Sequence, residues 1–138
     1  MNATTIIARQ TQGPLANPLL ETLAVAHYEQ VYTLCHAFHA DPALCLSLTN
    51  QIFRDASLDP ALLTVCRNAV HALTRRPGEL PVPACSLRDN LAWLLKEVMA
   101  LRYAEIAGVL GVDADQVRHT IAEVRETLLA AVDEQVAA

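Results

Sequence analysis

Two cysteines and two histidines that lie close together in the sequence have the side chains of a zinc site. The pattern C-H-x2-H-x5-C consists of Cys35, His36, His39 and Cys45. Thiolate and imidazole groups are the ligands that zinc prefers in proteins. Cys35 also falls on the apolar side of an expected helix, where a cysteine acts as a small buried apolar side chain. We favour this core role and expect no metal and no cofactor.

Other patterns that support catalysis are missing from the sequence. It has no glycine-rich phosphate loop, no HExxH and no GxSxG. None of its three serines has a histidine and a carboxylate nearby in the sequence. We therefore expect a protein that is not an enzyme.

The most informative stretch lies near the C-terminal end, where two expected helices flank a tight turn. Residues 103–110 are apolar at helical spacing and are followed by Gly111, which suits the turn. Asp113 then opens a second helix, with Gln116 three residues later as in a capping box. The small Ala107 lets the two helices pack closely. The pattern predicts a helix-turn-helix, and a purely structural bundle with the same turn is the alternative.

In a helix-turn-helix, the second helix enters the major groove of DNA. Its long polar side chains reach base edges, and its basic side chains hold phosphates. The candidate DNA-binding residues of the expected second helix are Gln116, Arg118, His119, Thr120 and Arg125.

The rest of the sequence indicates a small helical protein. Of its 138 residues, 53% are hydrophobic and 4% are aromatic, which favours packed helices over strands. The four cysteines form no CxxC pair, and we expect them to be reduced. No apolar run reaches the roughly 18 residues of a membrane helix, and the N-terminus lacks a secretory h-region. We expect an all-α, cytoplasmic protein that does not enter a membrane.

Prolines divide the expected fold into two small helical domains. They border a flexible tail over residues 1–18 and mark a linker over residues 77–86. We expect a three-helix domain over residues 19–76. A helix-turn-helix domain with an extended C-terminal helix is expected over residues 87–138.

Apolar spacing and start signals define the helices of the first domain. The first helix is expected to run from Leu19 to near Ala40. Asp41-Pro42 and Asp59-Pro60 each combine an N-cap with a proline at the first helical position and predict the next two helix starts. The apolar faces are expected to carry Leu20, Leu23, His27, Val31, Leu34 and Phe38 on the first helix and Leu44, Leu48 and Ile52 on the second.

Both halves of the chain resemble one protein family. Residues 101–112, with Val117, Arg118 and Arg125, are similar to the C-terminal helix-turn-helix of the extracytoplasmic-function sigma factors of bacterial RNA polymerase. The first domain resembles the N-terminal domain of that family at residues 27–32, 41–42, 51–56 and 65–76. The resemblance implies that the second domain reads the promoter −35 element. It also implies that the first domain docks on the polymerase clamp and melts the −10 element.

The sequence departs from the family at the residues that make these contacts. Residues 43–51 contain none of the carboxylates that the family uses to contact the clamp. The loop that captures a −10 base is shortened to the four residues between Ala56 and Ala61. On the expected recognition helix, Thr120 and Glu123 occupy positions that are commonly basic in the family.

The charge distribution also disfavours strong DNA binding by the second domain. Residues 86–138 carry five basic and nine acidic side chains, a net charge of −4, whereas the whole chain has a net charge of −5. Neutralisation of phosphates normally supplies much of the affinity for DNA. A protein partner is therefore favoured over DNA alone.

Two apolar features indicate where such a partner would bind. The alternating leucines of the second helix cannot all be buried by one helical face, so we name a candidate partner surface of Leu44, Leu46, Leu48 and Gln51. The alternative is that Leu46 is a single exposed leucine. The last helix continues its apolar pattern to Val136 and is a candidate contact with a partner or with a second copy.

Two functions from different classes remain open on the sequence. The first is a sigma-factor-like regulator that acts through RNA polymerase and promoter DNA, under the control of an anti-sigma factor. The second is a degenerate sigma mimic that sequesters an anti-sigma factor or assembles with a sigma-like partner, as a homo- or hetero-oligomer, without strong DNA binding.

Overall fold

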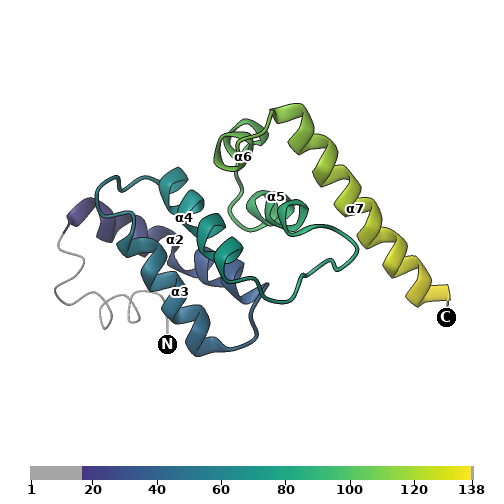
Figure 1. Ribbon diagram of the computed structural model, residues 1–138, viewed down its shortest axis with the longest axis horizontal. Coiled ribbons are helices and arrows are strands. Elements are labelled where there is room, and N and C mark those ends of the chain that lie inside the picture. The colour runs from purple at the N-terminus through teal and green to yellow at the C-terminus, as the bar shows by residue number, and fades with distance from the viewer. Residues whose placement is uncertain (1–16, 138) are drawn as a thin grey trace. The chain divides into compact units, whose positions relative to one another are not determined.

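The computed structural model describes residues 17–137, and the expected all-α fold is confirmed. The described residues form no strand; their six helices are α2 (Pro18–His36), α3 (Pro42–Arg54), α4 (Leu62–Arg75), α5 (Leu87–Glu97), α6 (Tyr103–Leu110) and α7 (Ala114–Ala137) (Figure 1). The chain divides into unit 1, which ends at Gly78, and unit 2, which begins at Glu79. Among the described helices, none has the length and apolar character needed to cross a membrane.

Two helices of unit 1 start with a side-chain cap. Asn17 Oδ1 accepts a hydrogen bond from the Leu19 backbone N–H at 2.9 Å, so α2 begins just before the expected Leu19. The rest of the expected tail, residues 1–16, lies outside the described residues. Asp41 Oδ1 accepts from the Ala43 N–H at 3.0 Å. The predicted start of α3 at Asp41-Pro42 is therefore confirmed.

Two other predicted boundaries of unit 1 are wrong. Helix α2 ends at His36 and not near Ala40, because the backbone N–H groups of Phe38 and His39 both turn back to the Cys35 carbonyl at 3.1 Å. Helix α4 begins at Leu62 and not at Asp59-Pro60. The N-cap residue is Ala61, which has no capping side chain, and Asp59 instead accepts a hydrogen bond from the Thr64 hydroxyl at 2.7 Å.

The core of unit 1 contains the predicted Ile52 of α3 but not the two leucines that the spacing also predicts. Cys45, Thr49, Ile52 and Phe53 are buried, whereas the expected core residues Leu44 and Leu48 are half-buried. The Thr49 hydroxyl donates to the Cys45 carbonyl at 2.7 Å and lies 3.8 Å from Cys35 Sγ of α2. Small side chains thus face α2 here, and the internal hydrogen bond allows a polar residue to be buried.

The predicted apolar stripe of the first helix is confirmed at four of its six residues. The buried members are Leu20, Val31, Leu34 and Phe38, and Cys35 is buried in the core role that the sequence predicts. Leu23 and His27 are only half-buried, whereas their neighbours Ala24 and Tyr28 are buried. The Tyr28 ring stacks on Phe53 with a distance of 5.9 Å between ring centroids. The Tyr28 hydroxyl donates to Asn50 Oδ1 at 2.7 Å, so this ring joins α2 to α3.

Gly78 closes unit 1 against the turn between α2 and α3. A Cβ atom at Gly78 would overlap the Phe38 carbonyl oxygen and would lie 2.7 Å from His39 Nδ1. The His39 Nε2 atom also forms a hydrogen bond with the Arg76 carbonyl at 2.9 Å. The chain after α4 is therefore fixed to this turn, and position 78 has no room for a side chain.

The segment before α5 belongs to the folded part of unit 2, although the sequence assigns it to the linker. Asn90 is fully buried, and its Oδ1 atom accepts a hydrogen bond from the Val82 backbone N–H at 2.8 Å. Its side-chain amide nitrogen donates to the carbonyls of Val82, Cys85 and Ser86 at 3.1, 3.3 and 2.8 Å. Residues 82–86 are held in place by this one side chain.

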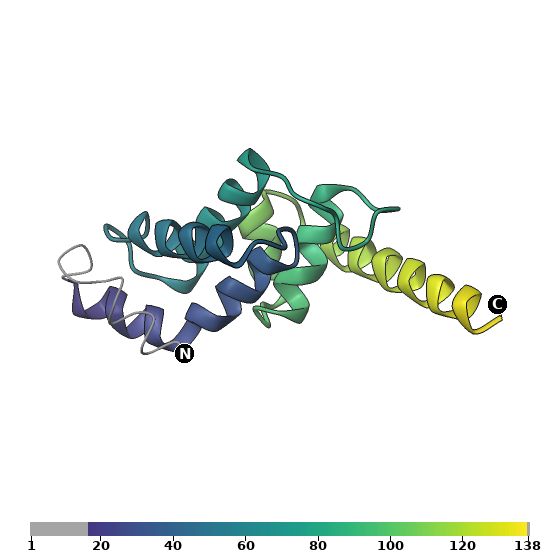
Figure 2. The same cartoon turned by 90° about the horizontal axis from the view of Figure 1, so that it is seen from below.

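The remaining core of unit 2 lies between α5, α6 and α7. Its fully buried residues include Leu95, Ile106, Ile121 and Val124. Ala107 is 7% exposed, in agreement with the predicted close packing of α6 and α7. Beyond Val124, helix α7 continues past α5 and α6, as Figure 2 shows at its yellow end.

Candidate functional site

The turn between α6 and α7 has the geometry that the sequence predicts. Gly111 has a φ of 72°, the left-handed conformation that glycine adopts without strain. The backbone N–H groups of Gly111 and Val112 both donate to the Ala107 carbonyl, at 2.8 and 3.1 Å. Asp113 Oδ1 accepts from the Gln116 backbone N–H at 2.8 Å and caps α7. The predicted turn and cap are confirmed.

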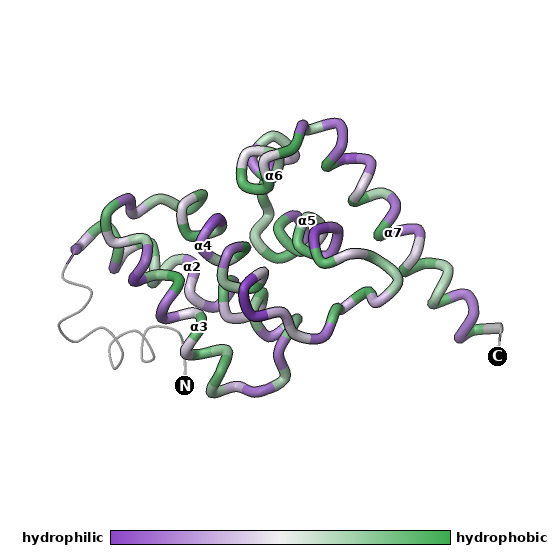
Figure 3. The backbone as a smooth tube through the Cα atoms, in the orientation of Figure 1, coloured by the Kyte–Doolittle hydropathy of each residue, from purple (hydrophilic) through white to green (hydrophobic). Residues whose placement is uncertain are grey.

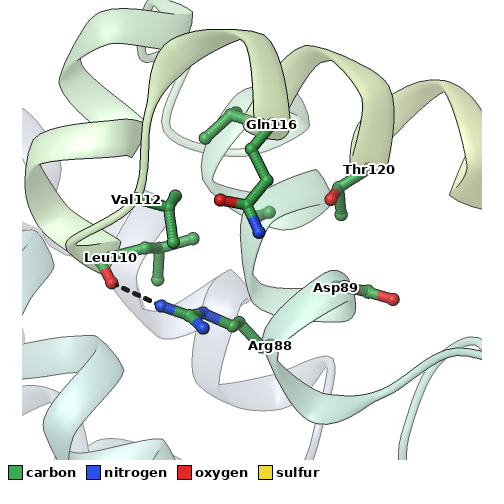
Figure 4. A pocket seen from close by; sticks show the side chains of 8 residues that line it. Arg88, Asp89, Leu110, Val112, Gln116 and Thr120 are labelled. Carbon is green, nitrogen blue, oxygen red and sulfur yellow. Dashed lines mark hydrogen bonds between the residues drawn. The ribbon is translucent and has the colours of Figure 1, made fainter.

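Two of the five candidate DNA-binding residues border a small hollow between α5 and the start of α7. Gln116 and Thr120 line it, and the Gln116 side chain points over it toward Arg88 (Figure 4). Arg88 Nη2 donates to the Leu110 carbonyl at 2.9 Å. The hollow has a volume of about 40 Å³, far below the 300 Å³ or more that is typical of a ligand pocket. It is a surface notch and not a binding site for a small molecule.

Arg118 is paired within its own helix. Its Nη1 atom donates to Asp115 Oδ1 at 3.0 Å, and its guanidinium carbon lies 5.2 Å from the centre of the Tyr103 ring. The Arg118 side chain is 61% exposed and that of Asp115 is 92% exposed. The pair is therefore open to solvent, and the Asp115 carboxylate lies directly beside the positive charge of Arg118.

His119 also faces a carboxylate. Its Nε2 atom lies 3.0 Å from Glu123 Oε1, one helical turn further along α7. Both side chains are exposed. Even a protonated His119 thus adds no net positive charge to this face of the helix.

Arg125 is held by a residue of α5. Its Nη2 and Nε atoms donate to Glu97 Oε1 at 2.7 and 3.2 Å. The hydrogen bond to the Glu97 carboxylate raises the pKa of the Arg125 guanidinium above its ordinary value. This interaction orients Arg125 along the α5–α7 contact.

Lys96 and Arg102 of unit 2 also have intramolecular partners, of different kinds. Lys96 Nζ donates to the Leu101 carbonyl at 3.3 Å and lies 4.9 Å from the centre of the Tyr103 ring. Glu105 Oε1 accepts from the Arg102 backbone N–H at 2.9 Å and from Arg102 Nε at 3.2 Å, and these hydrogen bonds lower the pKa of the Glu105 carboxyl. Within the described part of unit 2, every lysine and arginine has an intramolecular partner.

Sequence reasoning did not find the partners of the two arginines on α7. The spacing of Asp115 and Arg118 is that of neighbours on a helix surface and could have predicted their pairing. Glu97 lies 28 positions from Arg125, so only the fold brings them together. The same holds for the position of Tyr103 between Lys96 and Arg118.

The candidate partner surface on unit 1 is partly exposed. Leu44, Leu46 and Leu48 are half-buried and Gln51 is exposed, with its Nε2 atom donating to Asp55 Oδ1 at 2.7 Å. Gln51 borders two shallow hollows, one that includes Leu46 and one that includes Leu48. The structure thus places Leu46 and Leu48 on the two sides of Gln51, and Leu44 lines neither hollow.

The cysteine and histidine cluster forms internal hydrogen bonds. The Cys45 thiol donates to the His39 carbonyl at 3.2 Å and lies 3.9 Å from His36 Nδ1. Burial raises the pKa of the Cys35 thiol to about 12, which keeps it protonated. The described residues contain no group of three or more His, Cys, Asp or Glu side chains suited to hold a metal ion.

Comparison of the chain with protein-family models, with curated proteins and with solved structures finds no match.

Proposed function

We propose that this protein is a sigma-factor-like regulator of bacterial transcription that acts by contact with other proteins and not by strong DNA binding. One observation carries the proposal: the two arginines of the candidate recognition helix are neutralised by carboxylates of their own unit. Arg118 is paired with Asp115 and Arg125 with Glu97. Affinity for DNA depends on neutralisation of its phosphates. A helix whose arginines are paired with carboxylates is therefore expected to bind DNA weakly.

The sequence resemblance supplies the class of partner. By this resemblance, the N-terminal unit is matched to the clamp-binding domain of the sigma family and the C-terminal unit to its −35 domain. The partners are an anti-sigma factor, a sigma-like protein or RNA polymerase itself. On unit 1, the half-buried Leu46 beside the exposed Gln51 offers an apolar contact where the family has carboxylates.

A second candidate function is promoter recognition by the helix-turn-helix. The left-handed Gly111 and the Asp113 cap favour it, because both preserve the geometry that points the start of α7 at a groove. In that case the arginines of α7 leave their carboxylate partners and contact phosphates when DNA binds.

Two parallel experiments separate these functions. The full chain is purified from its native cell with its bound proteins, and the purified chain alone is used to select sequences from a random duplex DNA library. Our proposal predicts a stoichiometric protein partner and no enriched DNA sequence. Recovery of a defined promoter element by the chain alone overturns it.

A charge placed on the leucine surface tests where that partner binds. Leu46→Glu is expected to weaken the complex at least tenfold. The matched control is Ala26→Glu, which adds the same charge at an exposed position of α2 and leaves the complex intact. Equal loss in both variants, or in neither, removes Leu46 from the interface.

A further inference from the structure

The C-terminal end of α7 presents an apolar stripe that no part of its own unit covers. Leu129, Val132 and Val136 are 64%, 53% and 81% exposed, whereas the preceding core residues Ile121 and Val124 are fully buried. In Figure 1 this end of α7 runs beyond α5 and α6, and in Figure 3 it carries alternating apolar and polar bands.

These three residues share one face of the helix. At about 100° per residue, positions 129, 132 and 136 fall within roughly 60° of one another around the helix axis. Spacings of three and four residues are those by which an amphipathic helix anchors to an apolar partner surface. Scattered exposed leucines are common on proteins, but a stripe at helical spacing on a projecting helix is suited to docking.

Acidic side chains follow one edge of this stripe. Glu126 and Asp133 are seven residues apart, both exposed, and form no ion pair within the described residues. The basic residue of this segment, Arg125, is already held by Glu97. The uncovered surface is therefore apolar with a negative border.

The charges beside the stripe favour one kind of binding partner over another. A second copy that pairs through the same segment of α7 supplies no free cation for Glu126 and Asp133, because Arg125, the basic residue of that segment, is held by Glu97 in each copy. An antiparallel pair of copies would bring the two acidic borders side by side, which is unfavourable. A partner with positive side chains beside an apolar stripe meets both features at once.

We propose that the end of α7 is a docking site for an amphipathic helix of another protein, with an apolar stripe bordered by lysine or arginine. The inference names the chemistry of one partner and rests on the protein-contact function proposed above. It concerns the apolar stripe of α7 and not the leucine surface of unit 1.

The test measures binding of two labelled peptides to the full chain by fluorescence anisotropy. One peptide is an 18-residue amphipathic helix with a leucine stripe bordered by lysines, and its twin has glutamates in place of the lysines. The first is expected to bind saturably and at least tenfold more tightly than the second. Equal binding of the two peptides, or no saturable binding of the first, overturns the proposal.

Variants of the chain show whether the lysine peptide binds the apolar stripe or is attracted only by the negative charge of the protein. The double substitution Leu129→Gln with Val132→Gln keeps the net charge and is expected to weaken binding of the lysine peptide at least tenfold. Ala130→Gln, at an exposed position on another side of the helix, is the control and is expected to bind as the unsubstituted chain does. Far-UV circular dichroism checks that the helix content of each variant is unchanged.

The second copy is an explicit outcome of the same test. Sedimentation velocity that shows a dimer, dissociated by the double glutamine substitution but not by Ala130→Gln, assigns the stripe to self-association and overturns the proposal. Failure of the peptide test leaves the DNA selection experiment unaffected, and strong sequence-specific DNA binding leaves the peptide result unaffected. The two proposals therefore fail separately.

Discussion

Arg125 of α7 and Glu97 of α5 are joined by two hydrogen bonds, at 2.7 and 3.2 Å, both to the same carboxylate oxygen. The two residues lie on different helices of unit 2, so the interaction fixes the guanidinium to the body of the unit. Both side chains are nearly half exposed, and such a pair adds at most about 1 kcal/mol to stability. Its main consequence is electrostatic: it removes one positive charge from the candidate recognition helix.

Removal of the Glu97 carboxylate should restore that charge. Glu97→Gln is expected to steepen the logarithmic salt dependence of DNA binding by about 1 and to lower the free energy of unfolding by less than about 1 kcal/mol. Fluorescence anisotropy with duplex DNA and urea denaturation measure the two effects. Glu126→Gln, which changes the net charge equally at a residue without an ion pair in the described structure, is the control. If both variants steepen the salt dependence equally, net charge and not the Arg125 pair sets the affinity.

Loss of the Asn90 side chain should lower the free energy of unfolding of unit 2. Asn90→Ala removes four hydrogen bonds and leaves the backbone N–H and carbonyl of the buried Val82 without those partners. The expected loss is about 3 kcal/mol, since an unsatisfied buried polar group costs about 1–3 kcal/mol. Trp93, the single tryptophan, lies on α5 and reports the unfolding of unit 2 by its fluorescence. A loss below about 1 kcal/mol would mean that residues 82–86 are not held by Asn90.

The two glycines at positions 78 and 108 should respond to alanine in opposite directions. Gly78→Ala places a Cβ against the Phe38 carbonyl and should destabilise unit 1 by about 2 kcal/mol. Gly108→Ala meets no atom within 4 Å and lies inside α6, so it should stabilise the helix by about 0.5–1 kcal/mol. Thermal unfolding followed by circular dichroism gives both values. A neutral Gly78→Ala would show that the turn at residues 36–39 moves freely.

The buried Cys35 thiol should make the protein sensitive to alkaline pH. Burial raises the pKa of Cys35 from 9.0 to about 12, so the folded state binds this proton more tightly than the unfolded state. The stabilisation is complete below pH 9 and is lost as the pH rises from 9 toward 12. Urea midpoints at pH 8 and pH 10 are expected to differ more for the natural chain than for Cys35→Ala. The same pH dependence in both chains would contradict this assignment.

Helix starts and turns are predicted more successfully from the sequence than the packing of the helices is. Asp41-Pro42, Gly111 and Asp113 act through their own backbone neighbours, and all three are found where their spacing places them. The leucine spacing of α3 misleads because Thr49 is buried by a hydrogen bond to its own helix and by contact with α2. The hydrogen bond to Cys45 is local, but the burial also depends on α2, whose Cys35 lies 14 positions away.

The candidate site shows the same division. All five side chains named from the sequence fall on the first half of α7, because a helix fixes its own surface. The ion-pair partners of the arginines among them could not all be predicted, because Glu97 contacts Arg125 only through the packing of α5 on α7. The net charge of −4 over residues 86–138 shows an excess of carboxylates, but it does not show which carboxylate pairs with which arginine.

The most direct test of the proposed function is a salt titration of duplex DNA binding by the full chain, followed by fluorescence anisotropy. Two phosphate contacts give a logarithmic slope of about −2, whereas strong DNA-binding proteins with 6 to 10 contacts lose about 10³ to 10⁵ in affinity between 50 and 200 mM salt. We expect weak binding with a slope no steeper than about −2, and stronger binding in the double variant Asp115→Gly with Glu123→Arg. Nanomolar binding by the unsubstituted chain at about 150 mM salt would contradict the account and would favour promoter recognition by α7.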